Sequence, residues 1–272
     1  FRLTELRYAN EFIENGTIKF NTPQSWIDYY NKFGAGRGDQ YEGTLAFCNI
    51  DDVNRYFELR DKYSSKNVMN NKSRQISYDF AGNRILFKDK RALGLPCFCF
   101  YTLKHRIFSC SDLLGDQKIT AEIPPSYFRD FSNNLTQEEN SKLDKDQQQA
   151  IIFIKDYEKF KSRMFKALIT LGFEEKEIII NHVVYYDYNK YGKNSWLDFG
   201  KNYPEELFIK EKYFIDQSET RIVINSKKKD LVEKLIMNTI NLGNMMDIAE
   251  VTDKYLYDGM KIEGTVNICE ED

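Results

Sequence analysis

The chain has 272 residues, of which 42% are hydrophobic and 15% aromatic, and this much apolar surface excludes a globally disordered protein. Its formal net charge is −3, with Lys and Arg scattered among Asp and Glu, which argues against tight non-specific binding to nucleic acid. The sequence holds no run of about 18 apolar residues, and no apolar leader precedes Phe1, so we expect a cytoplasmic protein without membrane contact.

Apolar spacing and turn residues divide the first part of the chain into helices, strands and one polar loop. In chain order we predict a helix over Glu5–Asn15, a strand over Thr17–Asn21, a helix over Gln24–Asn31 that Pro23 opens, a strand over Thr44–Ile50, a helix over Asp51–Lys62 and a loop over Ser64–Arg74.

The rest of the chain is richer in strands. We predict strands over Arg84–Lys88, Leu95–Leu103, Lys118–Ile123, Ala150–Ile154, Ile178–Tyr188, Asp216–Asn225 and Asp247–Val251, and helices over Pro125–Phe131, Asp156–Leu171 and Lys227–Leu242.

Strands and helices alternate without a strict βαβ order. This favours an α+β fold of mostly antiparallel mixed sheets with flanking helices over a doubly wound parallel sheet. The acidic, Gln-rich and Asn-rich segment Leu135–Gln149 is the most linker-like in the chain. We therefore predict one domain over residues 1–272, with a polar insertion or linker around 132–149.

The strand Asp216–Asn225 carries the most site-like pattern. Alternate side chains of a strand share a face, so Gln217, Glu219 and Arg221 are expected to lie together, about 7 Å between neighbours. Three hydrogen-bonding groups on one face provide an anchor for a polar ligand. The alternative is a solvent-facing edge on which Glu219 and Arg221 form a weak surface pair.

The glycine-rich loop Gly34–Gly43 is the second candidate. Glycines let the backbone approach a ligand closely, and Arg37 is suited to bind a phosphate through two parallel hydrogen bonds. The loop lacks both the Gly-Lys-Ser/Thr ending of a Walker A motif and the strand–loop–helix setting of a dinucleotide-binding fold. A plain connecting loop is the alternative.

Cysteines and histidines argue against a metal or nucleophilic centre. The five cysteines are odd in number and lie mostly in apolar runs, which is typical of buried thiols in a reducing compartment. Cys97 and Cys99 share a strand face, but no second Cys/His pair at ligand spacing exists, so we expect core thiols rather than zinc ligands. We predict a core position for His182 and a solvated turn for His105.

Several motifs spread over most of the chain resemble one family. They are Phe1-Arg2-Leu3, Gly16–Phe20, Gly36–Gly43, Cys97–Phe100, Leu207–Lys210 and Gln217–Arg221. Their order resembles the DUF2971-like group, uncharacterised bacterial proteins of which many are encoded near phage-defence loci and which are often described as having an ADP-ribosyltransferase-like fold. The Gln-x-Glu step at Gln217 is also similar to the Gln/Glu-x-Glu motif of ADP-ribosyltransferases.

The resemblance implies an enzyme that cleaves NAD, bound as a substrate, and transfers ADP-ribose to an unknown acceptor, as a toxin or effector in antiphage defence. The acceptor is a macromolecule, either protein or nucleic acid, or a phage component. The resemblance makes Glu219 the catalytic glutamate and Gln217 the residue that orients the acceptor. The residues it assigns to NAD binding are Arg2, Arg37, Tyr101, Thr102 and Arg221.

In that assignment Arg2 contacts a phosphate or the ribose of NAD, and Arg2 or Arg37 holds the pyrophosphate. Tyr101 or Phe100 stacks on the nicotinamide, and Thr102 braces its pocket. Cleavage builds positive charge on the ribose, and an ionised Glu219 stabilises that charge. The neighbouring Arg221 keeps Glu219 ionised by lowering its pKa.

Two alternatives stay open. One is a non-catalytic sensor or binding module of the same fold in phage defence. The other is a metal-dependent nucleic-acid-processing enzyme in which Asp39, Glu42 and Glu219 hold a divalent ion.

Overall fold

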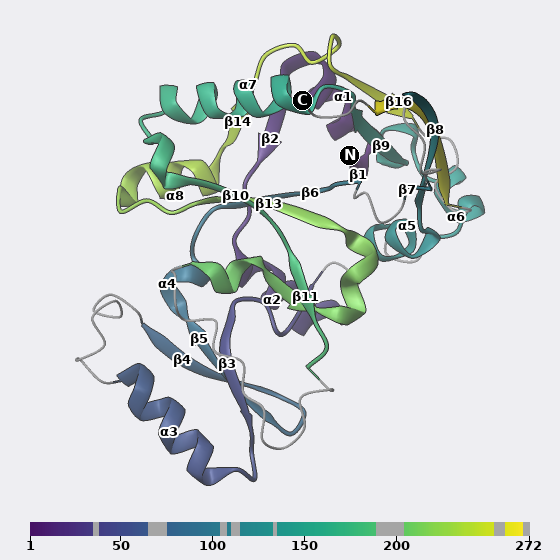
Figure 1. Cartoon of the computed structure of the whole chain (residues 1–272). Helices are drawn as coiled ribbons and strands as arrows, with labels where there is room; N and C mark the ends of the chain where they lie inside the picture. Colours follow the sequence, from purple (N-terminus) through teal and green to yellow (C-terminus); the bar gives the residue numbers. More distant parts are fainter. Residues whose placement is uncertain are drawn as a thin grey trace.

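The computed structural model describes residues 1–34, 38–64, 75–103, 108–109, 115–132, 135–188, 204–252 and 259–268. Figure 1 shows a mixed α/β structure in which several helices surround small sheets. All strand pairs in these residues are antiparallel except one, so the predicted mixture of helices with mostly antiparallel sheets is confirmed. No helix within the described ranges has the length and apolar character needed to cross a membrane.

A three-stranded sheet lies at the centre of the larger part of the molecule. Its order is β10–β13–β6, with β10 at Ile178–His182, β13 at Glu219–Ile224 and β6 at Cys97–Tyr101. Because β13 is the inner strand, its backbone pairs on both sides, and all six of its residues are buried.

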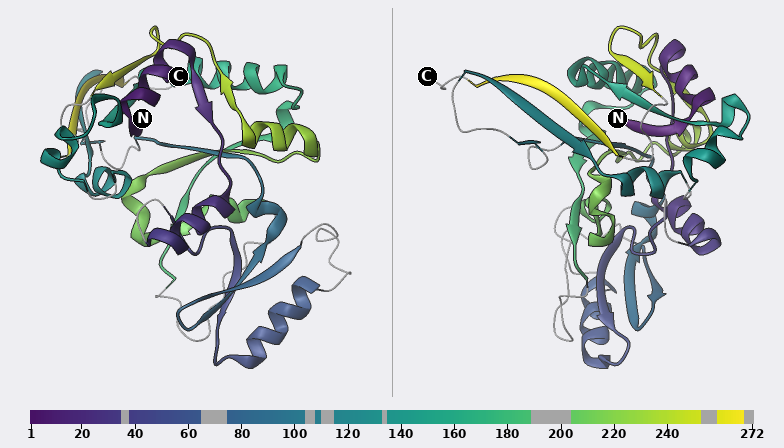
Figure 2. Two further views of the ribbon diagram at one scale, coloured as in Figure 1. Left: turned by 180° about the vertical axis from the view of Figure 1, so that it is seen from behind. Right: turned by 90° about the vertical axis from the view of Figure 1, so that its right-hand side faces the viewer.

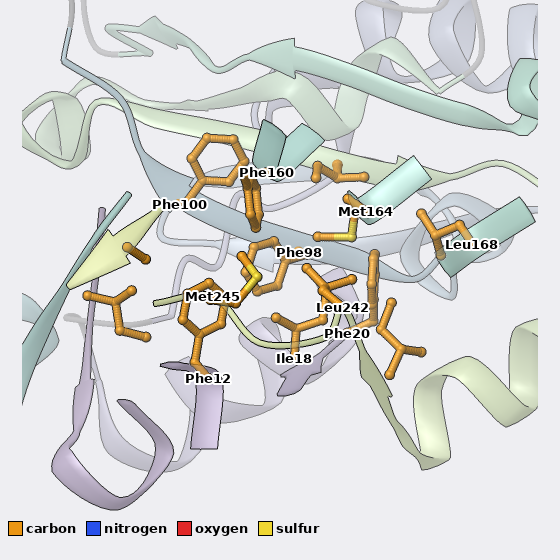
Figure 3. Packing of buried hydrophobic residues seen from close by; sticks show 14 of the residues in the cluster. Phe12, Ile18, Phe20, Phe98, Phe100, Phe160, Met164, Leu168, Leu242 and Met245 are labelled. Carbon is orange, nitrogen blue, oxygen red and sulfur yellow. The ribbon is translucent and has the colours of Figure 1, made fainter. Parts of the chain in front are cut away.

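One face of this sheet packs against the main apolar core. The helices around that core are α1 (Leu6–Asn15), α7 (Tyr157–Thr170) and α8 (Lys229–Met237). On α7 the buried Phe160, Met164 and Leu168 follow at four-residue spacing and form its inward stripe. Figure 3 shows Phe160 beside Phe98 and Phe100 of β6, with ring centroids 6.5 and 5.9 Å apart.

Two smaller sheets frame the outer edge of β6. The first has the order β1–β9–β15, with β1 at Arg2–Glu5, β9 at Gln149–Ile154 and β15 at Ala249–Thr252. The second pairs β2 (Thr17–Lys19) with β14 (Thr239–Asn241). Both sheets therefore bring the N-terminal segment of the chain close to β6.

A smaller lobe holds the sheet β3–β5–β4 and one helix, and it stands apart at the bottom of Figure 1. Its elements are β3 (Thr44–Asn49), α3 (Val53–Ser64), β4 (Ile76–Ala81) and β5 (Arg84–Asp89). Leu59 and Tyr63 of α3 pack with Phe87 of β5 in a core of their own.

The remaining elements connect these parts. Figure 2 shows the ribbon of β8 and β16 reaching out from the body in its right-hand view. The remaining elements, in chain order, are α2 (Pro23–Phe33), α4 (Lys90–Leu93), β7 (Phe108–Ser109), β8 (Gly115–Ile123), α5 (Pro125–Phe131), α6 (Gln137–Ser141), η2 (Lys145–Gln147), η3 (Glu175–Glu177), β11 (Val184–Tyr186), η4 (Glu205–Phe208), β12 (Ile209–Glu211), η5 (Lys212–Gln217) and β16 (Met260–Ile268).

Three expected segments differ from the structure. The strand predicted over Ile178–Tyr188 breaks at Val183, whose amide donates to the Glu219 carbonyl at 2.9 Å. The helix predicted over Lys227–Leu242 ends at Met237, because the residues after it pair with β2. The linker-like segment is folded in its described part, since a capping box at Thr136 starts α6 there. Of the predicted loop Ser64–Arg74, residues 65–74 lie outside the described ranges.

Candidate functional site

A cavity of about 420 Å³ lies beside β6 and is within the size range of small-molecule sites. Four buried polar side chains of its lining form a group that we call the polar floor: Lys210, Gln217, Glu219 and Arg221. The other charged or amide-bearing side chains of the lining are Arg2, Glu5, Lys19 and Asn21. Its walls are aromatic and come from α1, α2, β6 and α5: Tyr8, Trp26, Tyr29, Phe98, Phe100, Tyr101, Tyr127 and Phe131. The cavity therefore combines a charged base with extensive flat apolar surface.

The outer edge of β6 faces this cavity. On that edge the Cys97 amide donates to the Asn21 carbonyl at 2.7 Å, and the Tyr101 amide donates to the Phe1 carbonyl at 2.9 Å. Alternate residues direct their backbone groups to the same side, so the N–H and C=O of Cys99 also point outward. Within the described residues no backbone group pairs with Cys99 there. The wall thus presents one donor and one acceptor.

Two cations hold Glu219 between them. Arg221 Nε donates to Glu219 Oε1 at 2.6 Å, and Lys210 Nζ donates to Oε2 at 3.1 Å. Lys210 also donates to Gln217 Oε1 at 2.7 Å. On its other side Arg221 contacts both oxygens of Glu42, which lies just before the lobe. All five side chains belong to residues at most 5% exposed, so the whole network is removed from water.

These charges set the protonation state of Glu219. Burial alone would raise its pKa, but the positive charges of Arg221 and Lys210 outweigh burial and hold the pKa of Glu219 well below its usual range. Burial likewise opposes the charged form of Lys210, yet the Glu219 carboxylate outweighs it and raises the pKa of Lys210. Burial and the Glu219 charge raise the pKa of the half-buried Cys99 thiol. At neutral pH Glu219 is ionised, Lys210 is protonated and Cys99 is a thiol.

A strained turn at Ser218 brings Gln217 and Glu219 to the same lysine ammonium. The expectation of strand structure at Gln217 is wrong, because Lys212–Gln217 form a 3₁₀ helix and the strand begins at Glu219. Ser218 has φ of 38°, the one positive value among non-glycine residues of the described chain. Its hydroxyl donates to the Thr102 carbonyl at 2.8 Å. Such left-handed conformations are costly and cluster at functional sites.

The predicted alternative of a solvent-facing edge is wrong. Arg221 is completely buried, and its guanidinium donates to Glu219, to both oxygens of Glu42 and to the Leu207 carbonyl. It also lies 5.0 Å from the centroid of the Trp26 ring. With its donors used in this way, Arg221 fixes the direction of the Glu219 carboxylate, while its predicted contact with a cofactor stays a prediction.

The structure gathers most of the predicted site residues around the cavity. The Arg2 guanidinium lies 4.7 Å from the centroid of the Phe98 ring. The Tyr101 ring stacks on Phe1 with centroids 4.2 Å apart. Arg37 lies outside the described residues. The predicted residues that line the cavity are Arg2, Tyr101, Gln217, Glu219 and Arg221.

Thr102 lies on the opposite face of the sheet. Its Oγ1 is 2.7 Å from Oγ1 of Thr220, which alternates with Glu219 along the strand, and Thr220 Oγ1 is 2.6 Å from Nδ1 of His182. Thr102 is not among the residues that line the cavity. The predicted core position of His182 is wrong, because the residue is exposed and its ring contacts a hydroxyl. His105 lies outside the described residues.

The described part of the glycine-rich loop packs against protein, away from the cavity. A Cβ on Gly38 would lie 2.6 Å from the Trp26 carbonyl oxygen and 2.6 Å from the Tyr30 amide nitrogen, so the glycine permits close contact with α2. No described residue of the loop lines the cavity. This packing supplies a structural reason for the glycine that does not involve a ligand.

The three acids of the metal alternative face other protein groups. Glu42 and Glu219 both contact Arg221, and Asp39 Oδ1 accepts the Tyr41 amide at 2.8 Å. Burial raises the pKa of Asp39 and of Glu42, against the opposing charges of nearby cations. Among the residues described, no group of three or more His, Cys, Asp or Glu side chains is placed to hold a metal ion.

Sequence reasoning missed Lys210 as a member of the polar floor. The available signal was a lysine directly after the apolar run Leu207–Ile209. A lysine in such a run is almost never fully buried unless it is paired, so it implied a buried acid nearby. That acid is Glu219, whose carboxylate accepts a hydrogen bond from the Lys210 ammonium.

No protein-family model, no curated protein and no solved structure matches this chain. The resemblance to ADP-ribosyltransferases therefore stays a prediction.

Proposed function

We propose that the chain has a fold of the ADP-ribosyltransferase type, that the cavity binds NAD as a substrate, and that Glu219 promotes cleavage of the nicotinamide–ribose bond. The observation that carries this proposal is an ionised carboxylate on the floor of an aromatic-walled cavity. A carboxylate fixed in a site with little water stabilises positive charge on a sugar far better than one in bulk water.

The nicotinamide end fits the wall beside Glu219. Its carboxamide carries a carbonyl and an NH₂ group, which complement the outward N–H and C=O of Cys99. The open part of the edge lies between the contacts to Asn21 and Phe1, so it accepts a single amide group rather than an added peptide strand. The aromatic walls supply flat surface for the planar ring.

The proposed reaction is a substitution at the ribose. The bond between C1′ and the nicotinamide nitrogen breaks, and nicotinamide leaves as a neutral molecule with the bonding electron pair. Glu219 stabilises the developing oxocarbenium charge and accepts a hydrogen bond from the 2′-hydroxyl. An acceptor oxygen or nitrogen then bonds to C1′ and releases its proton to solvent. With water as acceptor, the products are nicotinamide, ADP-ribose and a proton.

The ion pairs of Glu219 leave capacity for the substrate. Each carboxylate oxygen accepts more than one hydrogen bond, and Arg221 and Lys210 donate to one oxygen each. Gln217 is held through its carbonyl oxygen by Lys210 and stands beside Glu219, where we propose that it helps to orient the acceptor. The acceptor itself is a protein, a nucleic acid or a phage component, in the antiphage role that the resemblance implies.

A non-catalytic sensor of the same fold is the second candidate. The observation that favours it is the pairing of Glu219 with two buried cations, because such a network defines a structure even where no bond is broken. In this case the cavity binds a nucleotide or a phage component without turnover.

Labelled NAD, incubated with the purified protein and cell extract, tests the proposal. We expect the parent to release nicotinamide and to label an acceptor, and Glu219→Gln to lose about 10²-fold or more of this activity because its charge is gone. Glu158→Gln is the matched control, since Glu158 is exposed on α7 far from the polar floor in the chain and lines no part of the cavity. It should behave as the parent does.

Calorimetry with NAD separates the two candidates. NAD binding without nicotinamide release by the parent supports the sensor. A parent protein that binds no NAD contradicts the proposed function.

A further inference from the structure

A second cavity, of about 460 Å³, adjoins the first. The two cavities share part of their lining, and we call the residues that line both the waist. These residues are Arg2, Thr4, Tyr8, Lys19, Asn21, Phe98 and Phe100. A ligand larger than one cavity can therefore extend from the polar floor past the waist into the second space.

The second cavity differs from the first in its chemistry. Apart from the waist, its lining is mainly apolar: Phe12, Ile18, Ile152 and Ile154 belong to the main core or pack against it, and Met237 is exposed. The lysine, glutamine, glutamate and arginine of the polar floor line only the first cavity. The second cavity therefore suits a planar, uncharged group such as a purine base.

The waist carries two cations. Arg2 comes from β1, and Lys19 comes from β2, where its ammonium donates to the Ile236 carbonyl. An ammonium has three N–H donors, and a guanidinium has five. Positive groups between a polar and an apolar space favour an anionic linkage such as a pyrophosphate at that point.

One acid lines the second cavity. Glu11 is exposed on α1, and it is the one acidic residue in the described lining of this cavity. A carboxylate accepts a hydrogen bond from a ribose 2′-hydroxyl and repels a phosphate at the same position, which is how other dinucleotide sites distinguish NAD from NADP.

We propose that the second cavity takes the adenosine end of NAD and that Glu11 selects NAD over NADP. This proposal rests on the proposed function, because it needs NAD in the first cavity. It adds a second subsite and a specificity residue that plays no part in bond cleavage.

Calorimetric titration with NAD and NADP tests the role of Glu11. We expect the parent to bind NAD about tenfold or more tightly than NADP, and Glu11→Lys to reduce this ratio about tenfold or more, mainly by tightening NADP binding. Glu14→Gln is the matched control, because Glu14 is exposed on the same helix and lines neither cavity. The ratio of NAD affinity to NADP affinity in Glu14→Gln should equal that of the parent.

A filled second cavity tests the subsite itself. Thr239 is exposed on β14 and lines the second cavity but not the first, so Thr239→Trp adds bulk to the second cavity with little effect on the packing of the core. We expect this variant to bind ADP and NAD about tenfold or more weakly, and nicotinamide mononucleotide as the parent does. ADP and NAD binding unchanged by Thr239→Trp, or an unchanged NAD/NADP ratio in Glu11→Lys, overturns the inference while the proposed function stands. A parent that binds no NAD overturns both.

Discussion

The two faces of the β6–β13 pair use the same strands in opposite ways. On one face Ile222 and Ile224 of β13 pack into the main apolar core. On the other face Cys99, Glu219 and Arg221 form the base and wall of a cavity, and Glu219 and Arg221 belong to a buried network of charges. Alternation along a strand thus places apolar residues, which stabilise the sheet by their burial, on one face. It places charged residues, whose burial is costly without a charged partner, on the other.

The largest effect is expected from breaking the charged face at its centre. Arg221→Leu leaves Glu42 and Glu219 buried with less compensation, so we expect a loss of about 3–5 kcal/mol in the free energy of unfolding. Urea unfolding measures this change. Arg163→Leu is the control, because Arg163 forms a partly exposed pair with Asp247 and should cost only a small fraction as much.

A double variant distinguishes the loss of these specific charge pairs from general misfolding. Adding Glu42→Gln to Arg221→Leu removes one of the two carboxylates that lost Arg221 as a partner, so part of the lost free energy should return. A double variant as unstable as the sum of its single variants would show that the two residues do not depend on each other.

A pH series tests whether the neighbouring cations lower the pKa of Glu219 in the folded protein. The pKa of Glu219 is lowered in the folded protein, so its contribution to stability is present above the ordinary glutamate pKa of about 4.3 and is lost as the pH falls below it. The difference in unfolding free energy between the parent and Glu219→Gln should shrink as the pH is lowered from about 7 to about 3. A difference that is constant or grows over this range contradicts the assignment.

The turn at Ser218, between η5 and β13, is expected to show a smaller effect. Ser218→Val places a β-branched residue in the left-handed region and should cost about 1–3 kcal/mol of unfolding free energy. Ser218→Gly is the control, since glycine adopts this conformation freely and loses only the hydrogen bond to Thr102, a change of about 1 kcal/mol or less. Equal losses in the two variants would remove the argument for strain.

The smallest effect is expected on the apolar face. Ile222→Val removes one buried methylene from the core side of β13 and should cost about 0.5–1.5 kcal/mol. Because Ile222 points away from the cavity, NAD binding and nicotinamide release should match the parent. A large loss of binding with so small a change in stability would mean that the two faces are not independent.

Local patterns predicted most of the longer helices and many strands, because their causes are local, whereas the short helices α4 and α6 were not predicted. α5 has the predicted bounds Pro125–Phe131, with proline at its first turn, and α7 follows from the spacing of Phe160, Met164 and Leu168. β14 was not predicted, because its residues continue an apolar helical pattern and become a strand only through pairing with β2, far away in the chain. The backbone pairing along the outer edge of β6 was not predictable from local patterns either, because it involves the distant residues Asn21 and Phe1.

The candidate site was predicted in part for the same reason. Gln217, Glu219 and Arg221 form a local cluster that is visible in the sequence, and the structure places all three around one cavity. Their complete burial was not predictable, because it depends on Glu42, which lies 179 residues from Arg221, and on Lys210. Charged residues close in sequence look like a surface pair until their distant partners are known.

The rate of nicotinamide release by Glu219→Gln tests the central claim most directly. We predict a folded variant that binds NAD within about threefold of the parent and releases nicotinamide about 10²-fold or more slowly, because the fixed negative charge beside the ribose is gone. A folded variant that binds NAD and releases nicotinamide as fast as the parent would contradict it.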